Sequence, residues 1–460
     1  MSVPFLALCE RGYTGPKVEK EAWDLDYVFE ESSSVVEEYG LERRGNELAP
    51  CDEARMRRFY QAGRELLRRI GVYNISTGRI IRLTPEEIDR AAAAQKKRLP
   101  MGCGKDAFIL YDRKPEDKRK PGVFAGNPGC PTPEGVFKAC VKSWAQEESV
   151  DMITCGSLVA VDGYPVRNGE PSEVEAVRRE LAYLNQAAAE VGRPGIGRLA
   201  AESSVSEVGD LAAAAPGLLR STDAHLVALN NELIINRDNL VRAASSAYTG
   251  VRNASLSCVM VEGMAGGAPG AAVVMIASML AANLVCCADY HLCHPIHLRH
   301  IATSTPECMW LQSVVCQAFA LCAPNIIVCD IYPKSGAMTK ELLYEVAANA
   351  LIATVSGGHL EGVGSCDGLK PHGTGLEARL MGEVGRAASM QGITRQSGEA
   401  IAQALVEKYK HVFEAGNEGV PFEQAYDPLR VVPQPQWLAL YDEVCKELAG
   451  MGLALTSAAG

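Results

Sequence analysis

The sequence predicts an α/β protein in which helices cover a parallel sheet. From about residue 123 onward, short apolar runs alternate with longer helical patterns, and the number of runs is near eight. Sustained alternation of this kind is typical of parallel strands joined by crossover helices. The runs are 150–156, 195–200, 218–223, 255–261, 284–288, 326–330 and 351–355. The pattern fits a closed barrel and also a doubly wound open sheet.

Both ends of the chain are expected to be helical. The clearest helical patterns lie at 52–70, 397–413 and 436–453. A further helix start is indicated at Thr84, because Thr is a good N-cap and Pro85 suits the first helical position. An uncharged, Ala-rich stretch at 271–288 is about the minimum length of a bilayer crossing. It lacks Lys or Arg at its edges and runs into Asp289, so we expect a core helix followed by a buried strand at 284–287.

Composition narrows the classes of function. The 460 residues are 47% hydrophobic, enough for one large domain with extensions. The formal net charge of −11 argues against a nucleic-acid binder. Sixteen cysteines are scattered without a Cys-x-x-Cys pair, which favours reduced thiols over a zinc ribbon or an iron–sulfur centre. The chain opens without a signal-like segment, so we expect a cytoplasmic protein that does not enter a membrane.

Distinctive phrases extend along nearly the whole chain. They lie at 192–204 (GRPGIGRLAAESS), 221–225, 264–267, 295–299 and 373–384. In these phrases and their order the chain resembles the monomethylamine methyltransferase family of methanogens. The resemblance implies a (β/α)8 TIM-type barrel with N-terminal and C-terminal helical extensions. We place the extensions at 1–120 and 391–460 and the barrel at 121–390.

Two departures from the family pattern concern the substrate site. The family carries pyrrolysine in the phrase that matches 192–204, and the ungapped match puts Leu199 at that position. Leucine has no electrophile, charge or hydrogen-bond donor. The family also places two glutamates after its Ala-Gly-Gly phrase, where this chain has Pro269 and Gly270. Leu199 and Gly270 are therefore expected to line a remodelled substrate site, and monomethylamine is not the expected substrate.

Asp330 and Tyr332 are the predicted catalytic residues. They lie where the family has Gln-Tyr-Tyr-Pro, so the tyrosine is retained and a carboxylate replaces an amide. A carboxylate beside an aromatic ring suits a cation. A quaternary ammonium fits best, because its amine leaving group is neutral and needs no proton. The alternative for Asp330 is a helix cap or a partner of an arginine.

Other polar residues are candidates because they follow predicted strands, where barrel enzymes place their reacting groups. Glu202 and Asp223 match the family and are expected to bind substrate, with a buried salt bridge as the alternative. His297 and Arg299 would share one face of a strand and could contact substrate or the corrinoid. Hydrogen bonding within the core is the alternative for these two residues.

Three functions are weighed. The leading hypothesis is a pyrrolysine-lacking methyltransferase that moves a methyl group from a small methylated amine to cobalt(I) of a separate corrinoid protein. The resemblance implies that this cognate partner supplies the corrinoid, that no cofactor is tightly bound and that the chain forms a homo-oligomer. The second is a zinc-assisted methyltransferase on a non-amine donor, using the histidines at 291, 294, 297 and 300. The third is a non-catalytic barrel that binds an amine or a corrinoid protein.

Overall fold

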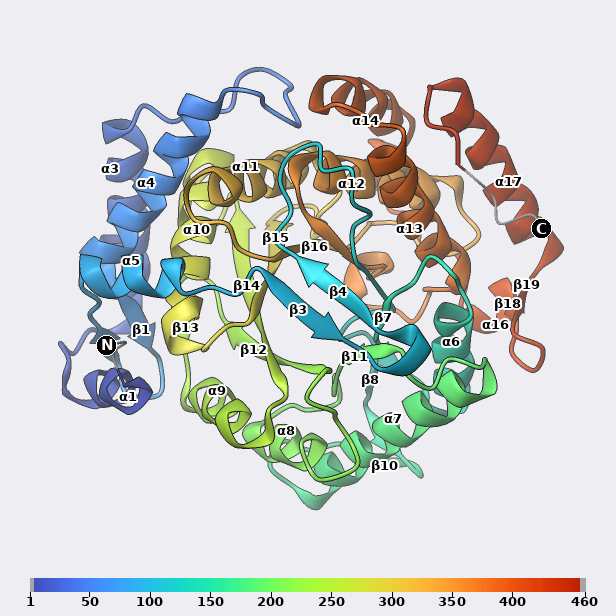
Figure 1. Ribbon diagram of the computed structural model, residues 1–460, viewed down its shortest axis with the longest axis horizontal. Helices are drawn as coiled ribbons and strands as arrows, with labels where there is room; N and C mark the ends of the chain where they lie inside the picture. Colours follow the sequence, from blue (N-terminus) through green and yellow to red (C-terminus); the bar gives the residue numbers. More distant parts are fainter. Residues whose placement is uncertain (1–3, 456–460) are drawn as a thin grey trace.

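Eight parallel strands close into a barrel at the centre of the computed structural model, which describes residues 4–455 (Figure 1). In order around the barrel they are β11 (Gly197–Leu199), β12 (Ala224–Leu229), β14 (Arg252–Val261), β15 (Tyr290–His297), β16 (Ile327–Ile331), β17 (His359–Gly362), β5 (Val123–Ala125) and β7 (Met152–Thr154). Every neighbouring pair is parallel. The predicted TIM-type barrel is confirmed, and the open sheet is excluded.

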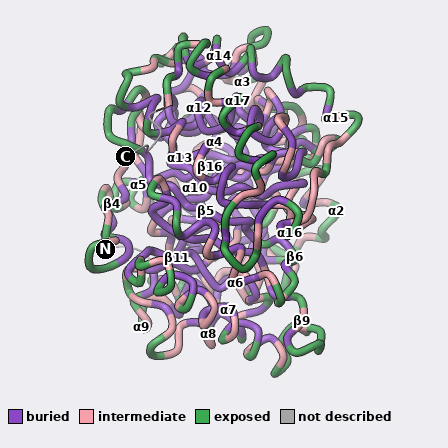
Figure 2. Tube along the Cα trace, turned by 90° about the vertical axis from the view of Figure 1, so that its right-hand side faces the viewer, coloured by how far each residue is buried: buried purple, intermediate pink, exposed green. Residues whose placement is uncertain are grey.

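Helices surround the barrel and bury its outer face. They are α6 (Glu134–Ala145), α7 (Pro171–Glu190), α8 (Glu207–Ala213), α9 (Arg237–Thr249), α10 (Ala268–Val285), α11 (Pro306–Cys322), α12 (Lys340–Ser356) and α13 (Gly375–Met390). The uncharged helix α10 is long and apolar enough to cross a membrane, yet 89% of its 18 residues are buried inside the protein. It is a core helix, as predicted, and it belongs to the buried interior visible in Figure 2.

Three of the predicted strands are wrong. The run 218–223 precedes β12, the run 284–288 is the end of α10 and the turn after it, and the run 351–355 lies within α12. For the runs 284–288 and 351–355 the reason is that a fully buried helix is apolar on all sides, so a short piece of it has the same composition as a buried strand. The strands themselves follow a few residues later in each case. This shift changes which residues stand at the strand ends.

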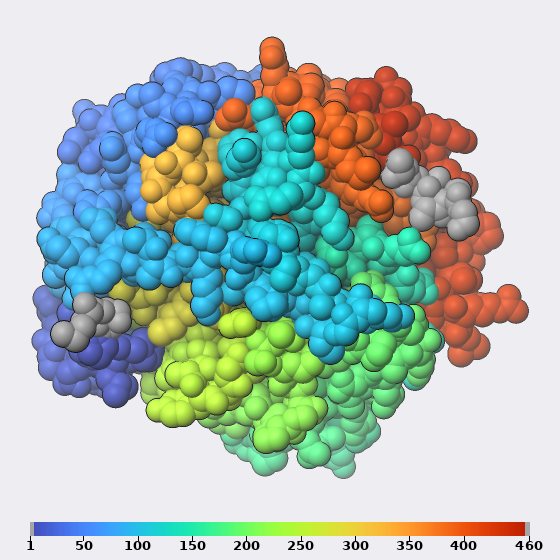
Figure 3. Space-filling model, in the orientation of Figure 1, coloured from blue at the N-terminus to red at the C-terminus, as the bar shows by residue number. Residues whose placement is uncertain are grey.

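A hairpin closes one end of the barrel. Its strands are β3 (Arg98–Met101) and β4 (Phe108–Tyr111), and Figures 1 and 3 show this segment lying across the barrel. Leu99, Met101 and Leu110 join a buried apolar cluster with Phe124 and Met152, and the hairpin also contacts the starts of two strands, through Gly102 N–H to the carbonyl oxygen of Thr222 and Tyr111 O to His359 Nε2. The hairpin therefore plugs the N-terminal end of the barrel. The carboxyl ends of the strands, where function is expected, are at the opposite end.

The N-terminal segment forms a helical layer beside the barrel. It contains α1 (Phe5–Thr14), α2 (Lys20–Ala22), a π-helix at Trp23–Phe29, α3 (Glu30–Glu38), α4 (Glu53–Ile70), β1 (Val72–Asn74), β2 (Arg79–Ile81) and α5 (Pro85–Ala93). The predicted N-cap is confirmed, because Thr84 and Glu87 form a capping box at the start of α5. The C-terminal segment contains α14 (Arg395–Tyr409), α15 (Val412–Ala415), α16 (Phe422–Ala425) and α17 (Pro435–Gly450). The division of the chain at residues 120 and 390 stays a prediction.

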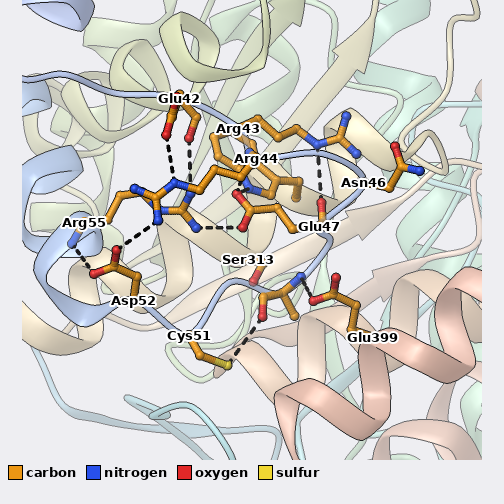
Figure 4. A network of polar contacts seen from close by, with 12 residues as sticks. Glu42, Arg43, Arg44, Asn46, Glu47, Cys51, Asp52, Arg55, Ser313 and Glu399 are labelled. Carbon is orange, nitrogen blue, oxygen red and sulfur yellow. Dashed lines mark hydrogen bonds and ion pairs between the residues drawn. The ribbon is translucent and has the colours of Figure 1, made fainter.

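A polar network ties these two segments to the barrel (Figure 4). The buried Arg55 donates from Nη2 to Glu47 Oε2 at 2.7 Å, and Trp310 of α11 donates from Nε1 to Glu47 Oε1 at 3.0 Å. Glu399 of α14 accepts a hydrogen bond from the backbone of Ala49 at 3.1 Å. Arg55 is buried and Glu47 is only partly exposed, so this ion pair and the hydrogen bonds to Trp310 and Glu399 hold the loop at 41–52 against the barrel and α14.

Candidate active site

Three neighbouring strands bring polar side chains together inside the carboxyl end of the barrel. Asp330 of β16 is paired in register with Glu361 of β17, and paired residues of parallel strands point to the same side of the sheet. His294 of β15 contacts the same group, with 2.8 Å between its Nδ1 and Asp330 Oδ2. Val328 belongs to the interior cluster, whereas Cys329 and Ile331 pack outward, so alternation turns Asp330 inward.

The two carboxyl groups are buried and incompletely paired. Asp330 and Glu361 are 2% and 1% exposed, and Oδ1 of the first and Oε2 of the second have no hydrogen-bond partner among the described residues. Burial raises the pKa of Asp330 to about 8. Burial and then the charge of Asp330 raise the pKa of Glu361 well above its usual range. Two adjacent carboxylates in a medium of low dielectric constant cannot both ionise without a compensating cation.

Glu202 adds a third carboxyl group to this end of the barrel. It follows β11 and keeps part of its surface exposed. Burial and then the charges of Glu180 and Glu361 raise its pKa well above the usual value. In the described part of the chain its carboxylate makes no hydrogen bond or ion pair, so the predicted alternative of a buried salt bridge is wrong. We call Glu202, Asp330 and Glu361 the carboxyl cluster.

A buried glutamate of α7 fixes the backbone that carries Glu202. The carboxylate of Glu180 accepts hydrogen bonds from the backbone N–H of Glu202 at 2.9 Å and of Ser203 at 2.7 Å. The thiol of Cys155 lies 3.1 Å from the same carboxylate. Because the loop is held by its main chain, the Glu202 side chain is left free to meet a ligand.

Tyr332 lies beside the carboxyl cluster and keeps part of its surface exposed. Its ring meets the His294 ring edge to face, with 4.5 Å between the ring centroids. Its hydroxyl donates to the carbonyl oxygen of Pro128 at 2.9 Å. A side chain at Gly364 would come within 2.3 Å of the Tyr332 ring, and one at Gly368 within 2.8 Å. Both glycines are therefore needed for the tight packing that fixes the ring.

Asp330 has neither of the structural roles considered from the sequence. Its Oδ2 contacts Nδ1 of His294, and within residues 4–455 it forms no ion pair with an arginine and caps no helix. Burial lowers the pKa of His294 to about 4, so this histidine is neutral at physiological pH. The carboxyl cluster is consequently not balanced by the imidazole.

Leu199 lies in the barrel interior, as the last residue of β11. It is 1% exposed and belongs to the apolar cluster that fills the barrel from the hairpin upward. Its register partner on β7 is Thr154. Leu199 and the apolar residues around it, such as Phe124 and Val328, lie on the hairpin side of the carboxyl cluster, and we call them the apolar floor. Glu202 follows Leu199 three residues later in the chain.

Asp223 lies at the other end of the barrel. It immediately precedes β12, since the strand begins at Ala224 and not at 218. Its carboxylate accepts hydrogen bonds from the backbone N–H of Arg198 at 3.1 Å and from Nη2 of Arg220 at 2.7 Å. The expectation that Asp223 follows a strand was wrong, and its position beside Arg220 fits the predicted alternative of a buried salt bridge.

Gly270 lies in the first turn of α10, away from the barrel interior. A side chain there would come within 2.0 Å of the carbonyl oxygen of Ala265. Gly270 and Pro269 line a surface groove of about 550 Å³ against residues 33–42, and no member of the carboxyl cluster lines that groove. The structure thus separates this position from Asp330.

His297 and Arg299 do not share a strand face, because β15 ends at His297 and Arg299 stands in the turn that follows. His297 is buried, with 3.7 Å between its Nε2 and Glu262 Oε2, and its ring lies 4.6 Å from that of His300. Arg299 is exposed. Both lie on the carboxyl side of the barrel, and their contact with substrate or corrinoid stays a prediction.

The histidines proposed for zinc do not converge. His291 faces the outer side of β15, where Ser255 Oγ lies 2.7 Å from its Nδ1 and Asn325 Nδ2 lies 3.2 Å from its Nε2. His294 points inward to Asp330, and His297 stands at the end of the strand. Among the described residues no group of three His, Cys, Asp or Glu side chains is arranged to hold a metal ion. The zinc alternative therefore lacks a site in this cluster.

Sequence reasoning missed Glu361 and the role of His294. Glu361 was not predicted because the strand was placed at 351–355, inside α12, and the real strand β17 that carries Glu361 begins only at His359. The sequence did contain one signal for this strand. The glycines at 357–358 end the helix, and the short segment 359–362 that follows them carries the acidic residue Glu361. His294 was considered only as a metal ligand.

Comparisons with known proteins agree with this geometry. The model of the family described as "Monomethylamine methyltransferase MtmB" matches residues 5–453. Monomethylamine methyltransferase MtmB2 of Methanosarcina acetivorans is 33% identical over 452 residues, covering 96% of this chain and 97% of its own. MtmB of Methanosarcina mazei is 33% identical over 448 residues, with the same coverage. The crystal structure of MtmB from Methanosarcina barkeri superposes with a TM-score of 0.96 at 31% identity, covering 99% of each chain, as does a structure described as the hydroxylamine MtmB complex.

Proposed function

Because the chain belongs to the monomethylamine methyltransferase family, whose members are corrinoid-dependent methyltransferases, we propose that it demethylates a small methylated ammonium cation, with a quaternary amine as the substrate. The observation that carries this proposal is the carboxyl cluster. Asp330 and Glu361 each leave one oxygen without a hydrogen-bond partner, Glu202 lies close enough for their charges to raise its pKa, and none of the three forms an ion pair with a lysine or arginine in the described part of the chain. Unbalanced buried acids favour the binding of a positive charge.

The surroundings of the carboxyl cluster suit methyl groups as well as charge. Leu199 supplies an apolar floor, and Tyr332 supplies an aromatic ring with exposed surface. Contact between an ammonium group and such a ring is worth roughly 0.5–2 kcal/mol. Leu199 offers no group that could form a bond with an amine. The site therefore favours recognition by charge and shape.

The expected chemistry is a displacement at the methyl carbon. When bound, a cobalt(I) corrinoid carried by a partner protein would provide the nucleophile to which the methyl group is transferred. The carbon–nitrogen bond breaks with its electron pair on nitrogen, and a quaternary donor leaves as a neutral tertiary amine that needs no proton. Asp330, Glu202 and Tyr332 would hold the donor, and the apolar floor would keep water from it. The cognate corrinoid protein, the cytoplasmic location and the homo-oligomer stay predictions.

Methyl transfer to chemically reduced cobalamin tests this proposal. The purified protein is offered monomethylamine, dimethylamine, trimethylamine, tetramethylammonium, choline and glycine betaine, and methylcobalamin formation is followed in the visible spectrum. We expect turnover with at least one quaternary amine and none with monomethylamine. A metal chelator should leave the rate unchanged, since the described residues form no metal cluster.

Two results would contradict the proposal. Turnover of monomethylamine would show that neither Leu199 nor the substitution at Gly270 excludes the family substrate. Saturable binding of a quaternary amine, without methyl transfer even when a corrinoid protein is supplied, would favour the non-catalytic barrel.

A further inference from the structure

Asp330 and Glu361, which we call the carboxyl pair, occupy equivalent positions on neighbouring strands. The register pairs them directly, and both are essentially inaccessible to water. Each has one oxygen without a hydrogen-bond partner among the described residues. A shared proton is the arrangement that lets two adjacent carboxyl groups remain buried, because two full charges would repel each other.

No neighbouring group is suited to accept this proton or to balance the charge of an ionised carboxyl pair. The titratable side chains that act on the pair, or feel its charge, are Glu202, Cys258, Tyr290, Cys293, His294, Cys329 and Tyr332. His294 is neutral, since burial lowers its pKa to about 4, and burial raises the pKa of Cys258 to about 12. Arg242 lowers the pKa of Glu202, but its guanidinium donates to the carbonyl oxygens of Ser204 and Ser206, both at 3.0 Å. Among residues 4–455, no lysine or arginine forms an ion pair with either member of the carboxyl pair.

We propose that Glu361 is a second cation-binding carboxylate, and that the carboxyl pair releases a proton to solvent when a cation enters the barrel. The exchange conserves charge, because one positive charge enters the site as another leaves it. A quaternary ammonium has no acidic proton of its own, so the released proton must come from the protein. A neutral molecule of similar size brings no charge into the barrel, so its binding should not release a proton. This inference rests on the proposed cation site. It adds a mechanism by which the site distinguishes a cation from a neutral molecule of the same size.

The two carboxyl groups have different roles in this exchange. Asp330 is tied to His294 through Oδ2, so its Oδ1 is the atom left to face a ligand or its neighbour. Glu361 stands beside Asp330 in the strand register, its Oε2 has no hydrogen-bond partner among the described residues, and the charge of Asp330 raises its pKa further. Replacing Glu361 by glutamine would place an N–H donor beside Asp330 Oδ1. The amide has no acidic proton and no charge that would repel an ionised Asp330, so this variant should give up fewer protons than the wild type when a cation binds.

Calorimetric titration with tetramethylammonium chloride tests the proposal at about pH 7, in two buffers that differ in ionisation enthalpy. The apparent binding enthalpies give the number of protons released. We expect about one proton for the wild type, with affinity that rises about tenfold per pH unit between about pH 6 and pH 8. For Glu361→Gln we expect less proton release than from the wild type and a correspondingly weaker dependence of the affinity on pH. The neutral tert-butyl alcohol should release no proton from either protein.

Glu262→Gln is the matched control. Glu262 lies on the carboxyl side of the barrel with a half-exposed side chain, so its replacement should leave proton release at the wild-type value. Thermal unfolding curves verify that both variants fold. Binding of tetramethylammonium without proton release in the wild type, or equal release from Glu361→Gln, would overturn the inference alone. Absence of any binding would overturn the cation site itself, and with it the proposed function.

Discussion

Replacing Asp330 by asparagine is expected to lower kcat/KM for a quaternary amine roughly 10²-fold, mainly through KM. Truncating one partner of a buried charge pair costs about 2–5 kcal/mol, and each 1.4 kcal/mol is about a factor of ten. The effect should appear in KM, because the donor loses its positive charge as the carbon–nitrogen bond breaks. A carboxylate therefore holds the bound substrate more tightly than its transition state. Steady-state kinetics with cobalamin as acceptor give both constants.

The same variant should be more stable than the wild type. Burial raises the pKa of Asp330 from 3.8 to about 8, so the folded state binds more protons than the unfolded state between these values. The free energy of unfolding of the wild type therefore falls as pH rises through this window. Asparagine does not ionise, so the variant does not lose this stability. The gain in the free energy of unfolding for Asp330→Asn should be small near pH 4 and grow toward about pH 8. A variant that keeps its KM, or that loses stability as pH rises relative to the wild type, would contradict a binding role for this buried acid.

Replacing Gly364 by alanine is expected to lower kcat/KM by roughly 10²-fold, because a displacement of about 1 Å at a substrate-positioning group has that effect. The new methyl group would lie 2.3 Å from Cδ1 of Tyr332. The ring cannot yield easily, since His294 packs against it and its hydroxyl is bound to the carbonyl oxygen of Pro128. Overpacking of this kind also costs about 1–3 kcal/mol of stability. Kinetics and chemical denaturation measure the two effects.

Gly135→Ala is the control for this substitution. Gly135 lies in α6, and no atom lies within 4 Å of the added methyl group. Helix propensity favours alanine over glycine by about 1 kcal/mol, so this control should be slightly stabilised and fully active. Equal activity of the two variants would show that the position of the Tyr332 ring does not matter for turnover.

The fold was predictable because strand and helix alternate over most of the chain, and because the phrases that resemble the family lie in the right order. The errors fell where apolar composition alone had to separate a strand from a buried helix. Residues 351–355 belong to α12, whose interior positions are buried on all sides, and the true strand is only four residues long. Since that strand carries Glu361, a boundary error concealed a member of the carboxyl cluster.

The candidate site was predictable in part for a physical reason. Glu202, Asp330 and Tyr332 stand at or just beyond the carboxyl ends of strands that were correctly located, and parallel strands bring those ends together. Asp223 was misplaced because its strand begins one residue later than the predicted run ends. Pairing between strands decides which residues meet. The contact of His294 with Asp330, and the register that joins Asp330 to Glu361, are therefore visible only in three dimensions.

A crystal of the protein soaked with tetramethylarsonium tests the central claim most directly. This cation is close in size to tetramethylammonium, and its arsenic atom can be located by anomalous scattering. We expect an arsenic peak inside the barrel, between the carboxyl cluster and the ring of Tyr332, and loss of that peak in crystals of Asp330→Asn. A peak confined to the surface, or an empty barrel at saturating arsonium, would contradict the claim that these buried acids hold a methylated cation.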